Sequence, residues 1–78
     1  MKRQISKENR ERAIRATQAL DNYKTICLGE TGVLGQEDIT DLLTDIRHLC
    51  EIFNGIFDFK NAVNSSLRHF KAERNGEI

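Results

Sequence analysis

The stretch EDITDLLTDIRHLCEIFN, residues 37–54, carries the strongest fold signal in the chain. Its apolar side chains recur at intervals of three and four residues, the spacing of one face of an α-helix. They are Ile39, Leu42, Leu43, Ile46, Leu49, Cys50 and Phe53. Acidic residues open the stretch, where the helix dipole favours anions, and Asn54-Gly55 supplies a left-handed stop. The pattern predicts a core-facing helix over residues 37–54.

Two further helical segments flank this one. The first, over about residues 6–28, begins at Ser6 as N-cap, and its apolar stripe starts late. That stripe consists of Ala13, Ala16, Leu20, Tyr23 and Cys27. The third, over about residues 59–73, follows Asp58 as N-cap and leaves residues 74–78 as a frayed tail. Its inward residues are predicted to be Phe59, Ala62, Val63, Leu67 and Phe70.

Strand alternation is missing over any useful length, so we expect an all-α fold, a small three-helix bundle. The 78 residues allow a single helical domain over residues 1–78. A chain this short buries only about 60% of the surface that its unfolded form exposes. Stabilisation by a second copy is therefore an open alternative, and the first helix could pack on its own chain or on a neighbour.

The two cysteines, Cys27 and Cys50, lie in apolar helical patterns and form no disulfide framework or zinc-ligand spacing. Both are expected to be reduced thiols. No segment is long enough to span a bilayer, and the charged N-terminus lacks the apolar run of a secretory signal. We therefore expect a soluble, cytoplasmic protein without membrane contact and without a cofactor.

The glycine-rich stretch ICLGETGVLGQEDITD, residues 26–41, superficially resembles a phosphate-binding loop. A Walker A loop needs a second glycine five positions after the first, followed by lysine and a hydroxyl residue. Five positions after Gly29 stands Leu34, no lysine follows, and Glu30 would repel a phosphate. The stretch is predicted to be a connector between helices, in which Gly29 caps the first helix.

Charge is unevenly distributed although the net charge is zero. Residues 1–15 hold six basic and two acidic side chains, and residues 30–58 hold one basic and seven acidic ones. Docking between copies, two oppositely charged partners and two solvated faces all fit this split, and solvated faces are the simplest explanation. Nucleic-acid binding through Arg10, Arg12 and Arg15 is an alternative function. It is disfavoured because glutamates interrupt the arginines and no aromatic residue is interleaved.

A candidate metal site lies on the polar side of the central segment. Asp41, Asp45 and His48 follow one line of the predicted helix, and His69 on the third segment could face them. A metal-dependent enzyme or metal-binding protein is thus a second alternative. A line of carboxylates is ordinary on a solvated face, however, and no second carboxylate-rich helix supplies further ligands. We predict no metal, no catalytic residue and no enzymatic activity.

The segments DLLTDIRHLCE and FDFKNAVNSSLRHFKAE resemble small uncharacterised proteins encoded on bacterial chromosomes, plasmids and phages. The shared pattern is Asp-Leu-Leu-x-Asp-Leu/Ile-x-His-x-Cys-Asp/Glu, then an Asp-Phe step into a final helix with a His and a Glu. The matching positions are Asp41, Leu42, Leu43, Asp45, Ile46, His48, Cys50, Asp58, Phe59, His69 and Glu73. The resemblance implies a bacterial or phage source and no particular activity.

These features favour a non-catalytic protein–protein interaction module, a homodimer that also occupies the surface of a partner protein. Apolar residues beyond one face of each helix lie near the two loops, and apolar patches surrounded by charge mark interaction sites. The predicted partner-binding residues are Leu34, Ile56 and Phe57. For a phage protein, inhibition of a host complex is one concrete form of this function.

Overall fold

A computed structural model describes residues 4–76 of the chain. Within this range there are three helices and no strand: α1 (Lys7–Asn22), α2 (Gln36–Ile52) and α3 (Phe59–Asn75). α1 continues directly into a short π-helical segment, η1 (Tyr23–Cys27). The prediction of an all-α fold with three helices is confirmed.

The helix ends differ slightly from the sequence prediction. The central helix ends two residues before the predicted position 54, and the last helix continues two residues beyond the predicted position 73. Residues 77–78 of the predicted tail lie outside the described range. Ser6 is the N-cap of α1, as predicted: its side chain accepts a hydrogen bond from the Asn9 amide at 3.1 Å.

The two loops also form as their sequences predict. Asp58 caps α3 by accepting a hydrogen bond from the Asn61 amide at 2.9 Å. Gly29 after η1 has φ 68°, and Gly55 after α2 has φ 94°. Residues other than glycine rarely adopt such positive φ angles, so both glycines allow the chain to turn where each helical segment ends.

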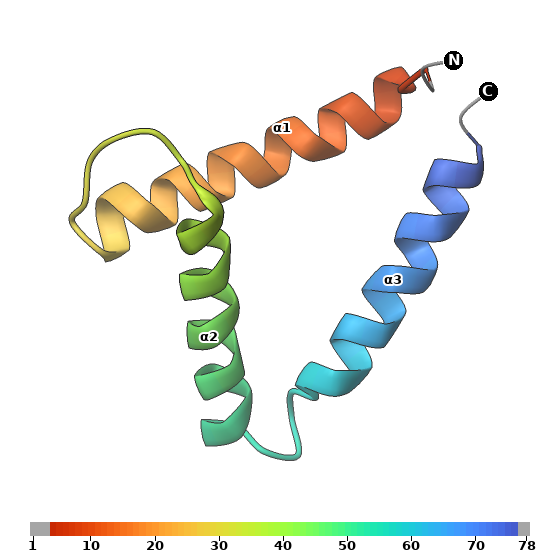
Figure 1. Ribbon diagram of the computed structural model, residues 1–78. Helices are drawn as coiled ribbons and strands as arrows, with labels where there is room; N and C mark the ends of the chain where they lie inside the picture. The colour runs from red at the N-terminus through yellow and green to blue at the C-terminus, as the bar shows by residue number, and fades with distance from the viewer. Residues whose placement is uncertain (1–3, 77–78) are drawn as a thin grey trace.

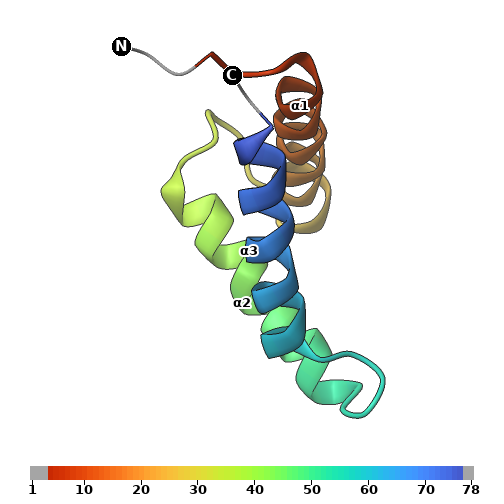
Figure 2. The ribbon, with the colours of Figure 1, turned by 90° about the vertical axis from the view of Figure 1, so that its right-hand side faces the viewer.

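The helices are arranged as the three sides of an open triangle (Figure 1). Seen from the side, the molecule is thin (Figure 2), and its extents are 42 × 34 × 17 Å. The triangle closes where the start of α1 meets the end of α3. There Asn9 donates a hydrogen bond to the Glu73 carbonyl at 3.0 Å, and the Arg12 guanidinium pairs with the Glu73 carboxylate at 3.0 Å.

Residues 4–76 form no apolar core, because the helices meet near their ends and not along their lengths. Among the described residues, no hydrophobic side chain is buried. Leu43, in the middle of the stripe predicted to be the core of the bundle, is 47% exposed. The apolar stripes of α2 and α3, which were predicted to face a core, are therefore not buried within one chain. No helix of the described part has the length and apolar character needed to cross a membrane.

Candidate functional site

The junction between α1 and α2 is built from polar side chains. Lys24 in η1 is buried, and its ammonium group donates to the Asp38 carboxylate and to the Val33 carbonyl, each at 3.1 Å. An ammonium group leaves water at a high cost unless it is paired, and here both contacts compensate it. Lys24 thereby holds the connector between the helices against the first turn of α2.

Asp38 receives a second contact from the backbone. Its carboxylate accepts a hydrogen bond from the Gly35 amide at 2.7 Å, so it closes the N-terminus of α2 from the third helical position. Only 1% of Asp38 is exposed. The Gly35 amide, followed by the Lys24 ammonium, lowers the pKa of Asp38 below its ordinary value of 3.8. Asp38 is thus ionised at neutral pH and has a structural role.

Tyr23 provides another contact between the same elements. Its hydroxyl donates a hydrogen bond to the carboxylate of Asp45 on α2. That hydrogen bond, followed by desolvation and the negative charge of Asp45, raises the pKa of Tyr23 from 10.0 to about 12. One of the four candidate metal ligands, Asp45, is therefore engaged with a phenol.

The structure does not gather the four candidate metal ligands, Asp41, Asp45, His48 and His69, into one group. Within the described range, the carboxylates close enough together to share a cation are Glu30, Asp38 and Asp41. This group includes one of the candidates. Its buried member already contacts the Lys24 ammonium, which supplies positive charge at this position.

The three arginines proposed for nucleic-acid binding lie on exposed turns of α1. They do not form one free basic surface. Arg12 pairs with Glu73, and Arg10 donates from its guanidinium to the Ile5 carbonyl at 3.4 Å. Arg15 makes no ion pair with any residue in the described range. Arg12 is therefore engaged in the contact between α1 and α3.

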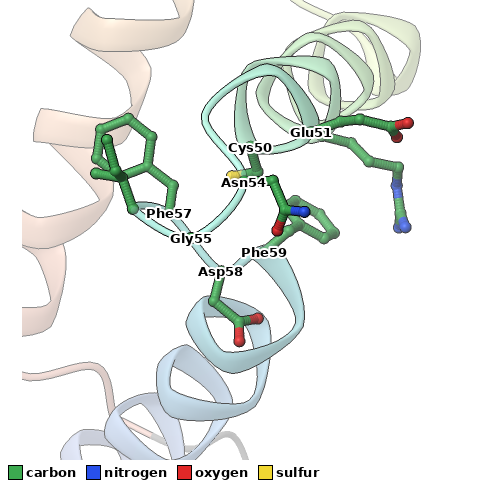
Figure 3. Close-up of a pocket in the computed structure, with 9 residues that line it drawn as sticks. Cys50, Glu51, Asn54, Gly55, Phe57, Asp58 and Phe59 are labelled. Atoms are coloured by element: carbon green, nitrogen blue, oxygen red, sulfur yellow. The ribbon is translucent and has the colours of Figure 1, made fainter.

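The turn between α2 and α3 and the adjoining helix ends line an open hollow of about 560 Å³. It is lined by Arg47, Cys50, Glu51, Asn54, Gly55, Ile56, Phe57, Asp58 and Phe59. Figure 3 shows the rings of Phe57 and Phe59 on opposite sides of the turn. The Arg47 guanidinium lies 4.3 Å from the centre of the Phe59 ring, a cation–π contact across the junction of α2 and α3.

Apolar side chains are prominent on this turn. Ile56 is 73% exposed, and Phe57 is also exposed although its ring packs edge-on against Phe53, with the centroids 5.8 Å apart. Leu34, the third predicted partner-binding residue, lies in the connector before Gln36, at the other end of α2. The 17 residues of α2 separate the two loops by about 25 Å, given a rise of 1.5 Å per residue. Leu34 therefore does not belong to the Ile56 and Phe57 surface.

Sequence reasoning missed the role of Lys24. The only local signal is a lysine placed beside the apolar stripe of the first helix, in the segment YKTICL. Its partner Asp38 stands 14 residues later and was assigned only to the helix dipole. Lysines beside apolar stripes usually extend their ammonium groups into water, so the pairing required the folded connector.

Comparison of the chain with known protein families, curated proteins and solved structures finds no match.

Proposed function

We propose that this chain is a non-catalytic protein-binding module that docks a partner protein on the turn between α2 and α3. The observation that carries the proposal is the exposure of Ile56 and Phe57 on a turn that also forms a hollow. Charged side chains surround these residues, namely Arg47, Glu51 and Asp58. Apolar side chains ringed by charge are typical of protein-interaction sites.

The position of the turn also supports docking. It forms one corner of the triangle (Figure 1). It lies at the end of α2 opposite to the junction with α1, and away from the corner where α1 and α3 meet. A partner can therefore reach Ile56 without disturbing the polar junction between α1 and α2. The resemblance to proteins of bacterial chromosomes, plasmids and phages favours a bacterial protein as the partner, and inhibition of a host complex is one form of such binding.

The test is affinity capture from a bacterial lysate with three tagged forms of the chain: wild type, Ile56→Asp and Val33→Asp. Val33 is 92% exposed on the connector at the other end of α2, so its variant is a matched control. We expect a protein captured by wild type and Val33→Asp to be lost with Ile56→Asp, because a carboxylate cannot enter an apolar interface without cost. Binding of the purified partner is then measured by calorimetry.

Two results would contradict the proposal. One is equal capture of the same proteins by all three forms, and the other is no protein enriched above the tag alone. Circular dichroism of each variant establishes that its helices are intact before the capture is interpreted.

A further inference from the structure

We propose that a second copy of this chain covers the apolar sides of α1, α2 and α3, so that two chains form an intertwined dimer. The dimer rests on the proposed function in one respect, since both require apolar surface to be covered by protein. They use different surfaces, because the dimer contact lies along the helices and the partner site lies on the turn around Ile56.

The single chain exposes more surface than a compact protein of its mass does. It exposes 6763 Å², whereas a compact protein of 9.0 kDa exposes about 4,900 Å². A compact protein of twice that mass exposes about 8,000 Å², so two such chains would bury about 5,500 Å² on forming one. Obligate homodimers bury about 2,000–5,000 Å² or more in total, so the excess suits a dimer of this class.

The dimensions of the chain lead to the same conclusion and also constrain the arrangement. Its radius of gyration is 14.9 Å, whereas a compact domain of 78 residues has about 11.5 Å. Two copies that share a common centre keep the radius of gyration of one copy. A compact protein of twice this length has a radius of about 15 Å, so interpenetrating copies fit and copies joined end to end do not.

The side chains that a second copy would cover are the helical stripes predicted to form a core. In one chain they are half-exposed: Leu43 by 47%, Leu67 by 50% and Phe70 by 54%. They recur at helical spacing, so each helix presents an apolar face that is incompletely covered. The sequence pattern of a core is explained if these faces complete their packing on another chain.

The charges of the helices determine which helix of the second copy covers which. α2 holds five acidic side chains and Arg47, a net charge of −4, and α3 holds four basic side chains and Glu73, a net charge of +3. Several of these charges form no ion pair with another described residue of the same chain. They include Asp41 and Glu51 on α2 and Lys71 on α3. Two-fold symmetry with α2 against α2 would bring like charges together. Each α2 is therefore expected to lie along α3 of the other chain.

The first experiment measures the mass and size of the purified, untagged chain by sedimentation equilibrium and small-angle X-ray scattering. We expect a mass of twice 9.0 kDa and a radius of gyration close to 14.9 Å. A monomeric mass over the whole concentration range would overturn the dimer. A dimer with a clearly larger radius would overturn the intertwined arrangement.

A matched pair of variants locates the contact. Leu43→Gln changes the apolar stripe, and Thr44→Gln makes the same residue at the next position, on the opposite side of α2. We expect the dissociation constant of the Leu43→Gln dimer to rise about 30-fold and that of Thr44→Gln to be unchanged. Leu43 is 47% exposed in one chain, so in each of the two chains the variant loses the burial of about half of a leucine side chain at the interface. Equal dissociation constants for the two variants would contradict contact through this stripe.

Cross-linking tests the arrangement on the unmodified sequence and does not depend on any variant folding. Chain labelled with ¹⁵N is mixed with unlabelled chain, unfolded in urea and refolded so that the chains exchange, and then treated with a carbodiimide, which joins lysines to carboxylates in contact. We expect mixed-isotope links between Lys60 or Lys71 of α3 and the carboxylates of α2. Links confined to chains of one isotope would overturn the pairing of α2 with α3.

The outcomes separate the dimer from the partner site. A dimer in pure solution with no partner captured from lysate would defeat the proposed function alone. A monomer that still captures a partner, and loses it with Ile56→Asp, would defeat the dimer alone.

Discussion

The two junctions at the ends of α2 are built from opposite kinds of contact. At the junction with α1, the only two buried side chains in the described part of the chain, Lys24 and Asp38, form an ion pair. At the junction with α3, partly exposed aromatic side chains make the contacts: Phe53 packs on Phe57, and Arg47 lies over the Phe59 ring. Polar contacts are directional, so they set the angle between α1 and α2, whereas the apolar junction retains surface for further contacts.

The largest expected effect comes from breaking the polar junction. Lys24→Met should reduce the free energy of unfolding by about 3 kcal/mol, because it leaves a buried carboxylate without its cation. The measurement is urea denaturation followed by circular dichroism. Lys7→Met, which removes a lysine from the exposed first turn of α1, is the control and should change little. Equal losses for the two variants would show that the ion pair does not secure this junction.

Alanine substitutions at Gly55 and Gly35 test how much backbone strain each of the two loops beside α2 contains. Gly55→Ala should cost about 1–2 kcal/mol, because φ 94° is unfavourable for alanine although the space around it is open. Gly35 has φ −134°, and an added methyl group there meets only the flexible end of Glu37. Gly35→Ala should therefore change stability by less than about 0.5 kcal/mol. Thermal melting of both variants would reveal a reversed order if the connector were the strained turn.

The polar junction should also respond to pH in two opposite ways. The raised pKa of Tyr23 means that its hydrogen bond stabilises the fold below pH 10.0 and is lost as pH rises towards 12. The lowered pKa of Asp38 means that its contribution is present above pH 3.8 and is lost as pH falls through the folded value. Denaturation across pH should show Tyr23→Phe less stable than wild type at neutral pH, with the difference shrinking above pH 10.0. A constant difference up to pH 12 would contradict the assignment.

The third corner of the triangle should matter less than either junction of α2. Arg12 and Glu73 pair at 3.0 Å with both side chains partly exposed. Arg12→Gln should therefore cost about 0.5 kcal/mol, and added salt should diminish the difference from wild type. Urea denaturation at low and high salt measures both quantities. A salt-independent cost well above this value would mean that α1 and α3 are held together by other contacts.

The smallest expected effect concerns the carboxylates near the polar junction. Magnesium, manganese or zinc should leave the melting midpoint of the chain unchanged, because the Lys24 ammonium already supplies the positive charge beside Glu30, Asp38 and Asp41. A ligand that binds the folded state must raise the midpoint. A saturable increase with one of these ions would revive the metal-binding alternative.

Periodicity and capping residues were sufficient to predict the helices. The spacing of apolar residues in 37–54 identified α2, and Ser6 and Asp58 each cap a helix as expected. These are local properties, since hydrogen bonds and side-chain faces within a helix depend on residues three or four positions apart. The same reasoning placed the predicted partner-binding residues near loops but grouped Leu34 with Ile56, which folding places at the other end of α2.

By itself, the sequence determined which segments are helical, their ends to within about two residues, and that each helix carries one apolar face. Only the tertiary structure decided that these faces stay uncovered within one chain and that Lys24 lies against Asp38. The physical reason is range: a helical face is defined by neighbours within two turns, whereas its burial depends on contacts between distant segments. In this chain those contacts occur at the corners of an open triangle, so the apolar sides remain available to another protein surface.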